Sequence, residues 1–298
     1  MSGDFESQHI VEGPVLQIVT VTDPMCVWCW GSYPLLRTLG WRYGDSIQLD
    51  DWMGGMVPDI RETMEPRKGL EGLGRIEALN QTLAYYWERS VKKHGMPVNA
   101  AKFALFDEDN PSGWPICEAV GAAGLQGDLQ GQRMNRRLRE GIYLYGEKVN
   151  RLSVQIELAE QCGLDIGAFV MAMKDGSAGR VFRNDVQNAI DFNVQVFPTW
   201  IVRDRAENTT VLEGVQTWDA LVEVIDKMTD GRLVRKKPIA NSQEVLRFLR
   251  RYGNAADEEL IQALDYEPSA LQDDLAEMER NNQITIERFG QKMLISEA

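Results

Sequence analysis

The sequence predicts an α/β protein with a large helical insertion and a small α+β module at its C-terminal end. Three observations predict this class. Short β-branched, apolar runs typical of buried strands occur near the start of the chain and again after residue 190. Between them, apolar residues recur mostly at helical spacing. A basic, proline-containing segment at residues 232–240 then precedes residues 241–298, whose pattern predicts three helices and a β-hairpin.

The first predicted strand, residues 14–22, leads directly into two cysteines, Cys26 and Cys29, at the start of a predicted helix at residues 29–43. A Cys-x-x-Cys pair between a strand and a helix is typical of a redox dithiol. Its thiolate is the nucleophile, and the thiol pKa falls where backbone N–H groups converge at a helix N-terminus. Pro34 lies within the predicted helix, so it should bend the helix or mark its first turn.

Two other interpretations of the cysteine pair stay open, a zinc-ligand pair and two inert core cysteines. A structural zinc site usually needs two further ligands. The remaining cysteines, Cys117 and Cys162, are isolated within apolar helical patterns, where free cysteine packs as a small apolar residue. His94 has no partner nearby in the sequence. We expect no metal and no bound cofactor.

Composition narrows the function classes. The chain has 298 residues, a formal net charge of −13, four cysteines and two histidines. The negative charge disfavours non-specific contact with nucleic acid or anionic membranes. No apolar run is long enough to span a membrane, and the polar, acidic tail at residues 1–13 does not resemble a secretory signal. We therefore expect a cytoplasmic protein in which a Cys-x-x-Cys pair is catalytic or metal-binding rather than structural.

The rest of the main body, residues 14–231, follows in order. An alternating run predicts a second strand, and the period then becomes helical over a predicted insertion at about residues 58–176. β character returns in a run that contains Pro198, which suits only a strand start, a bulge or a cis bond. The further predicted strands are residues 47–52, 194–202 and 209–214, and the helices flanking the last two are residues 177–191 and 218–228.

Together these residues resemble the DsbA-like branch of the thioredoxin superfamily over roughly residues 14–230. The order of elements is the same, and the motif from Asp23 to Gly31 is similar to that of cytosolic members. The resemblance implies a thioredoxin fold with a large helical insertion. It also implies a thiol–disulfide oxidoreductase.

The resemblance also implies residue roles. Cys26 would be the nucleophile, Cys29 the resolving cysteine and Pro198 a cis proline beside them. Strongly oxidising periplasmic members carry a histidine where this chain has a tryptophan, so a less oxidising pair of reductase or isomerase type is expected. On the substrate side the resemblance implies Val27, Trp28, Phe197 and Thr199, with Val27 and Trp28 tuning the dithiol and Phe197 offering its backbone to substrate.

The C-terminal module, residues 241–298, resembles a winged-helix domain with helices at 242–251, 257–264 and 268–281 and a hairpin at 284–287 and 292–295. Winged helices commonly bind DNA through the third helix, which needs a basic face. Here six basic residues stand against twelve acidic ones, and the third helix is itself acidic. We therefore expect a protein-interaction or dimerisation module and no nucleic-acid binding.

Three hypotheses follow. The first is an oxidoreductase acting on protein or small-molecule disulfides or thiols, with glutathione among the candidates. The second is an adaptor that presents a protein partner to other machinery and whose dithiol is regulatory or dispensable. The third is a redox-sensing transcription regulator, which the acidic module disfavours.

Overall fold

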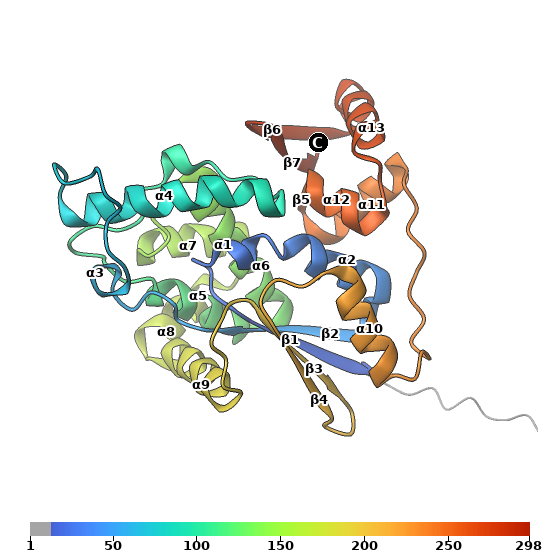
Figure 1. Ribbon diagram of the computed structural model, residues 1–298, viewed down its shortest axis with the longest axis horizontal. Helices are drawn as coiled ribbons and strands as arrows, with labels where there is room; N and C mark the ends of the chain where they lie inside the picture. Colours follow the sequence, from blue (N-terminus) through green and yellow to red (C-terminus); the bar gives the residue numbers. More distant parts are fainter. Residues whose placement is uncertain (1–12) are drawn as a thin grey trace, which may run out of the picture.

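The computed structural model describes residues 13–298, and Figure 1 shows their arrangement. The predicted N-terminal tail, residues 1–13, lies almost entirely outside the described residues. The central sheet has four strands in the order β2-β1-β3-β4. β1 and β2 are parallel, whereas β3 is antiparallel to both β1 and β4. The strands are β1 (Leu16–Thr22), β2 (Ile47–Met53), β3 (Thr199–Asp204) and β4 (Thr209–Glu213).

Both faces of the sheet are covered because the apolar residues of β1 alternate between them. Leu16 and Ile18 pack with α2 (Tyr33–Tyr43) and α10 (Trp218–Met228) on one face. Val19 and Val21 pack on the other face, near the end of α9 (Ser177–Asp191). The mixed α/β class is therefore confirmed.

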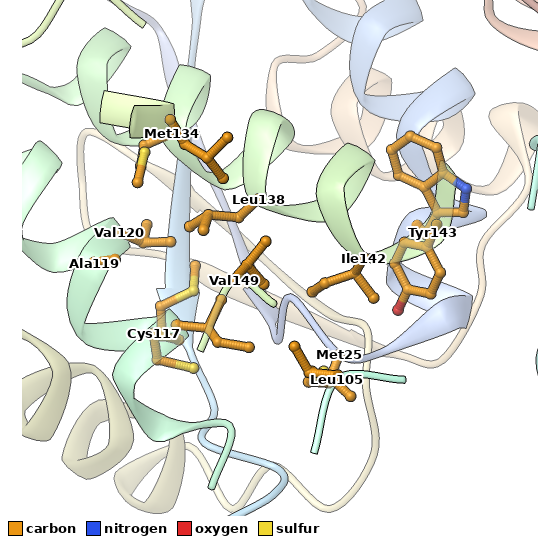
Figure 2. Close-up of a cluster of buried hydrophobic side chains, with 14 of the residues drawn as sticks. Met25, Leu105, Cys117, Ala119, Val120, Met134, Leu138, Ile142, Tyr143 and Val149 are labelled. Atoms are coloured by element: carbon orange, nitrogen blue, oxygen red, sulfur yellow. The ribbon is translucent and has the colours of Figure 1, made fainter. Parts of the chain in front are cut away.

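The helical insertion lies between β2 and β3 and contains the largest hydrophobic cluster described here. Figure 2 shows part of this cluster, in which Cys117, Leu138 and Ile142 pack among other apolar side chains. Cys117 is buried there as a core residue. Besides α9, the helices of the insertion are α3 (Ile60–Thr63), α4 (Arg75–His94), α5 (Trp114–Gly124), α6 (Asp128–Glu140), α7 (Leu152–Gln161) and α8 (Ile166–Lys174), and α6 continues into a π-helical turn (Gly141–Tyr145).

Two predicted elements differ from the structure. The helix predicted at residues 29–43 is broken into α1 (Val27–Trp30) and α2, which starts with Pro34 in its first turn because proline has no N–H to donate. The strand predicted at residues 194–202 begins only at Thr199. Before it, the Val194 N–H donates to Ala189 at the end of α9, so this segment caps a helix instead of joining the sheet.

The C-terminal region is a separate small α+β unit, as predicted, packed against α2 through its second helix (Figure 1). The sequence missed one short strand, β5, which gives a three-stranded sheet of order β5-β7-β6. The winged-helix assignment and the exact domain boundaries stay predictions. The elements are α11 (Ser242–Tyr252), β5 (Asn254–Ala256), α12 (Asp257–Leu264), α13 (Pro268–Arg280), β6 (Ile284–Phe289) and β7 (Lys292–Glu297).

Candidate functional site

The two cysteines lie at the start of α1, immediately after the β1 strand. Cys26 is the N-cap residue of α1, and its Sγ accepts a hydrogen bond from the Cys29 N–H at 3.2 Å. This contact exists because the helical turn brings residue i+3 back over residue i. Both thiols are free and nearly buried, with 4% of Cys26 and 2% of Cys29 exposed.

The loop before β3 completes the site. The Phe197–Pro198 peptide bond is cis, and the Phe197 carbonyl oxygen lies 3.8 Å from Cys26 Sγ. The Phe197 ring rests on Gly54, where an added Cβ would stand 2.2 Å from a ring atom. The structure thus brings together Cys26, Cys29 and Pro198, which are far apart in the sequence.

The four residues expected on the substrate side are placed differently. Trp28 is 42% exposed, and its ring meets His94 edge-on at 6.1 Å. Phe197 is half-buried beside Cys26. Val27 is 8% exposed, and Thr199 is fully buried with its hydroxyl donating to Val196 O. Of the four, Trp28 is exposed and Phe197 is half-buried, whereas Val27 and Thr199 are buried, so the roles of all four on the substrate side stay predictions.

A buried arginine, which sequence reasoning missed, lies behind the dithiol. Arg139 of α6 is 1% exposed and donates from Nη2 to Thr22 Oγ1 at 2.6 Å. Thr22 ends β1, and its hydroxyl contacts the Cys29 thiol. The only signal for Arg139 in the sequence is a charged residue placed one turn after Asn135 and beside Leu138.

Each of the two thiols affects the pKa of the other, because the sulfurs lie side by side. Burial and the neighbouring Cys29 raise the pKa of Cys26 well above its ordinary value. Burial would also raise the pKa of Cys29, but the Cys26 thiol, the Arg139 charge and the Thr22 hydroxyl outweigh it and lower that pKa. The pKa values of the two thiols therefore move apart, that of Cys26 upward and that of Cys29 downward.

Asp23, in the motif itself, is a buried carboxyl beside the dithiol. It accepts from the N–H groups of Met25 and Met56 and from the Cys117 thiol. Burial raises the pKa of Asp23 despite these hydrogen bonds. Asp23 thus shapes the loop that carries Cys26.

The dithiol lies outside the cleft between α2, α6 and α11, and the described residues form no metal site beside it. Within residues 13–298, no group of three or more His, Cys, Asp or Glu side chains could hold a metal ion. A cleft of about 740 Å³ lies instead between α2, α6 and α11, and half-buried Cys162 is part of its wall. No helix among the described residues is long and apolar enough to cross a membrane.

Comparison with known proteins identifies the family. A family model described as thioredoxin matches residues 20–223, a span that holds the dithiol and the cis proline. The chain belongs to this thioredoxin family. Its structure is similar to the cytosolic disulfide reductase DsbM from Pseudomonas aeruginosa, with 20% identity, a TM-score of 0.54 and coverage of 72% of this chain and 98% of that one. The DsbA-like resemblance is confirmed at the level of the fold.

Two relatives that match most of this chain are named as adapters and not as disulfide reductases. A ClpXP adapter protein SpxH from Halalkalibacterium halodurans is 24% identical and covers 90% of this chain and 84% of its own. Another from Shouchella clausii is 27% identical over 84% of this chain and 78% of its own. A match over 90% of the chain must extend past residue 240, into the C-terminal module.

Proposed function

We propose that this protein is a thiol–disulfide oxidoreductase of reductase or isomerase type that works in the cytoplasm. The observation that carries the proposal is the Cys26–Cys29 contact at the start of α1, directly beside the carbonyl of Phe197 and the cis Pro198. Two free thiols one helical turn apart can close a disulfide. The adjacent backbone can align an extended substrate.

The reaction follows from the placement of the sulfurs. Cys26, once deprotonated, attacks a substrate disulfide, forms a mixed disulfide and releases one substrate thiolate. Cys29, deprotonated, then attacks the Cys26 sulfur, which closes the Cys26–Cys29 disulfide and releases the second substrate thiolate. Two electrons pass from the dithiol to the substrate, and an external thiol must reduce the enzyme again. The structure of DsbM with GSH supports glutathione as a candidate for that thiol.

Insulin reduction by dithiothreitol tests this proposal. Cys26→Ser should abolish the catalysed rate, and Cys29→Ser should accumulate mixed disulfides with substrate. Cys162→Ser is the matched control because Cys162 is a free, half-buried thiol outside the site, so its rate should be unchanged. Turnover by both active-site mutants at the wild-type rate would refute the enzyme proposal.

A second candidate function is that of an adaptor, and the curated relatives favour it. SpxH proteins are named ClpXP adapters, and their similarity extends into the C-terminal module. In this case the module, or the exposed face near Trp28, would bind a protein partner. Purified ClpX should then be retained by immobilised Cys26→Ser/Cys29→Ser protein as well as by wild type, whereas failure of both to retain it would remove this candidate.

A further inference from the structure

The dithiol has a cation behind it that comes from the helical insertion. Arg139 projects from α6 toward the end of β1 and donates to the hydroxyl of Thr22, which in turn contacts Cys29. Its Nε donates to the Asn135 side chain at 3.0 Å. The charged group therefore lies one hydroxyl away from the sulfur of Cys29.

No direct ion pair compensates this arginine in the described part of the chain. Among residues 13–298, no ion pair includes Arg139, and its Nη1 is buried without any hydrogen-bond partner. Burial raises the pKa of Asp23 and of Asp51 overall, although the charge of Arg139 lowers both pKa values. An unpaired buried charge is costly. A negative charge that forms only in the reduced dithiol would offset that cost.

We propose that Arg139 is the positioning residue of the dithiol, whose guanidinium, acting through Thr22, holds the reduced pair as a thiolate. This inference deepens the proposed oxidoreductase function and rests on it. Arg139 supplies the positive charge that strongly oxidising relatives obtain from a histidine between the cysteines, a place that Trp28 takes here.

The charge acts on one redox state more than on the other. In the reduced protein the sulfur anion compensates Arg139, whereas closing the Cys26–Cys29 disulfide removes that anion and leaves the guanidinium unpaired. Stabilising the reduced form makes the disulfide form a stronger oxidant. A nearby opposite charge typically shifts a pKa by one to three units. We therefore expect Arg139 to shift the equilibrium between the dithiol and its disulfide by at least about tenfold.

The variants are chosen to separate charge from packing. Arg139→Met keeps much of the side-chain volume and removes the charge, and Arg139→Lys restores a charge. Thr22→Val removes the bridging hydroxyl at nearly constant volume. Arg137→Met is the matched control, because Arg137 lies on the same helix but is paired with Glu147 and Gln161 near the surface. Each is measured by thiolate absorbance against pH and by equilibration with glutathione.

Arg139→Met should raise the apparent pKa of the first ionisation of the dithiol by about one unit. It should also shift the equilibrium with glutathione about tenfold toward the disulfide form, which is about 30 mV for a two-electron couple. Arg139→Lys should recover most of both shifts, and Thr22→Val should show a smaller shift in the same direction. Arg137→Met should match wild type. An unchanged titration and equilibrium in Arg139→Met would overturn the inference.

The melting temperatures of the reduced and oxidised proteins distinguish a charge effect of Arg139 from a merely structural one. Wild type should melt at a higher temperature reduced than oxidised, and this gap should shrink in Arg139→Met even if both forms are destabilised. Equal loss in both redox states would mean that Arg139 only packs, and would refute the inference. The thiol titration needs no substrate, so it tests Arg139 even if insulin turnover fails and the oxidoreductase proposal falls.

Discussion

Two arginines of α6, three residues apart, are buried for different reasons. Arg136 donates to Glu140 at 2.6 Å and to both carboxylate oxygens of Glu259 at 2.9 and 3.0 Å. Arg139, by contrast, has only neutral hydrogen-bond partners. The difference shows that burial alone does not reveal a role. Arg136, whose charge is balanced by carboxylates, joins two parts of the fold. Arg139, whose hydrogen-bond partners are neutral, lies beside two thiols and can respond to their charge.

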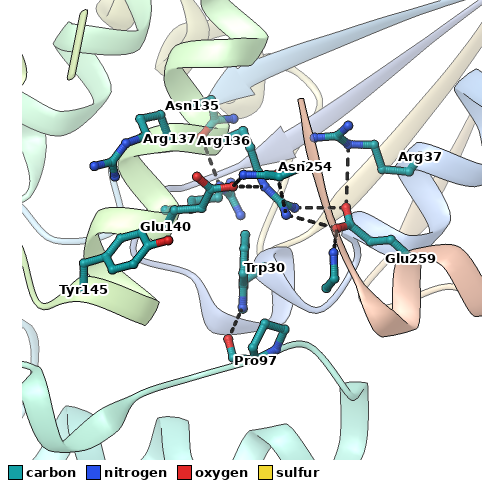
Figure 3. A network of polar contacts seen from close by, with 12 residues as sticks. Trp30, Arg37, Pro97, Asn135, Arg136, Arg137, Glu140, Tyr145, Asn254 and Glu259 are labelled. Atoms are coloured by element: carbon teal, nitrogen blue, oxygen red, sulfur yellow. Dashed lines mark hydrogen bonds and ion pairs between the residues drawn. The ribbon is translucent and has the colours of Figure 1, made fainter. Parts of the chain in front are cut away.

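The contacts of Arg136 form an ion cluster that joins the C-terminal module to the thioredoxin domain (Figure 3). Glu259 of α12 is fully buried and also lies 3.6 Å from Arg37 of α2. The guanidinium of Arg136 stacks 4.6 Å from the Trp30 ring, next to Cys29 in the chain. The module therefore docks directly behind the dithiol helix, through charges that are mutually compensated.

Removing a carboxylate from the ion cluster around Arg136 should have the largest effect on stability. Glu259→Gln leaves Arg136 and Arg37 without their shared carboxylate in a buried site. We expect a loss of about 3–4 kcal/mol in the free energy of unfolding, because removing one partner of a buried pair strands the other charge. Urea unfolding followed by tryptophan fluorescence measures it. A loss below about 1 kcal/mol would mean that the cluster is not compensated as described.

His94 lies against the Trp28 ring and near the charge of Lys292 in the C-terminal module. Its replacement should have the next largest effect on stability. Burial, and then the charge of Lys292, lower its pKa to about 4 from 6.5. The folded state thus keeps His94 neutral. Its contribution to the free energy of unfolding is fully present above pH 6.5 and is lost as pH falls toward 4, because the unfolded chain takes up a proton at a higher pH than the folded chain. His94→Gln should remove up to about 3 kcal/mol of this acid sensitivity. Unfolding free energies at pH 7 and pH 4 test it, and identical pH slopes would contradict it.

Asp185 of α9 is a half-buried carboxyl beside the end of β2, and its replacement should have a smaller effect on stability. Burial raises its pKa to about 7, and the repulsion of Asp51 adds to this despite the Met53 N–H that it accepts. Because the pKa of Asp185 is higher in the folded state, its protonated form contributes stability that is fully present below pH 4 and is lost as pH rises toward 7. Asp185→Asn should therefore be more stable than wild type by about 2 kcal/mol at pH 8 and equal to it at pH 4. Destabilisation at pH 8 would instead indicate a salt bridge.

An exposed ion pair in the same C-terminal module gives the smallest effect and serves as the control for Glu259→Gln. Glu279 pairs with Arg288 at 2.8 Å on the surface, where solvent screens the charges. Glu279→Gln should leave the unfolding midpoint unchanged within error, measured by the same urea titration. A loss comparable to that of Glu259→Gln would show that burial is not what distinguishes the two pairs.

Much of the architecture was predictable from local pattern. The period of apolar residues located the strands at 14–22 and 209–214 and the terminal helices within about one or two residues, because burial imposes that period directly on the sequence. Pattern failed at residues 194–198, where an apolar run meets the dithiol instead of the sheet. It also failed to separate Val27 and Thr199, which are buried, from Trp28, which is exposed.

By itself, the sequence determined the dithiol, the chain order of a thioredoxin domain and the acidic character of the C-terminal module, since spacing, order and charge are local properties. Only the tertiary structure decided what surrounds the sulfurs. Arg139 lies more than a hundred residues from Cys26 and reaches the dithiol because α6 packs against the end of β1. A single missing histidine in the motif therefore says little about the charge near a thiol, because electrostatic interactions act through space and not along the chain.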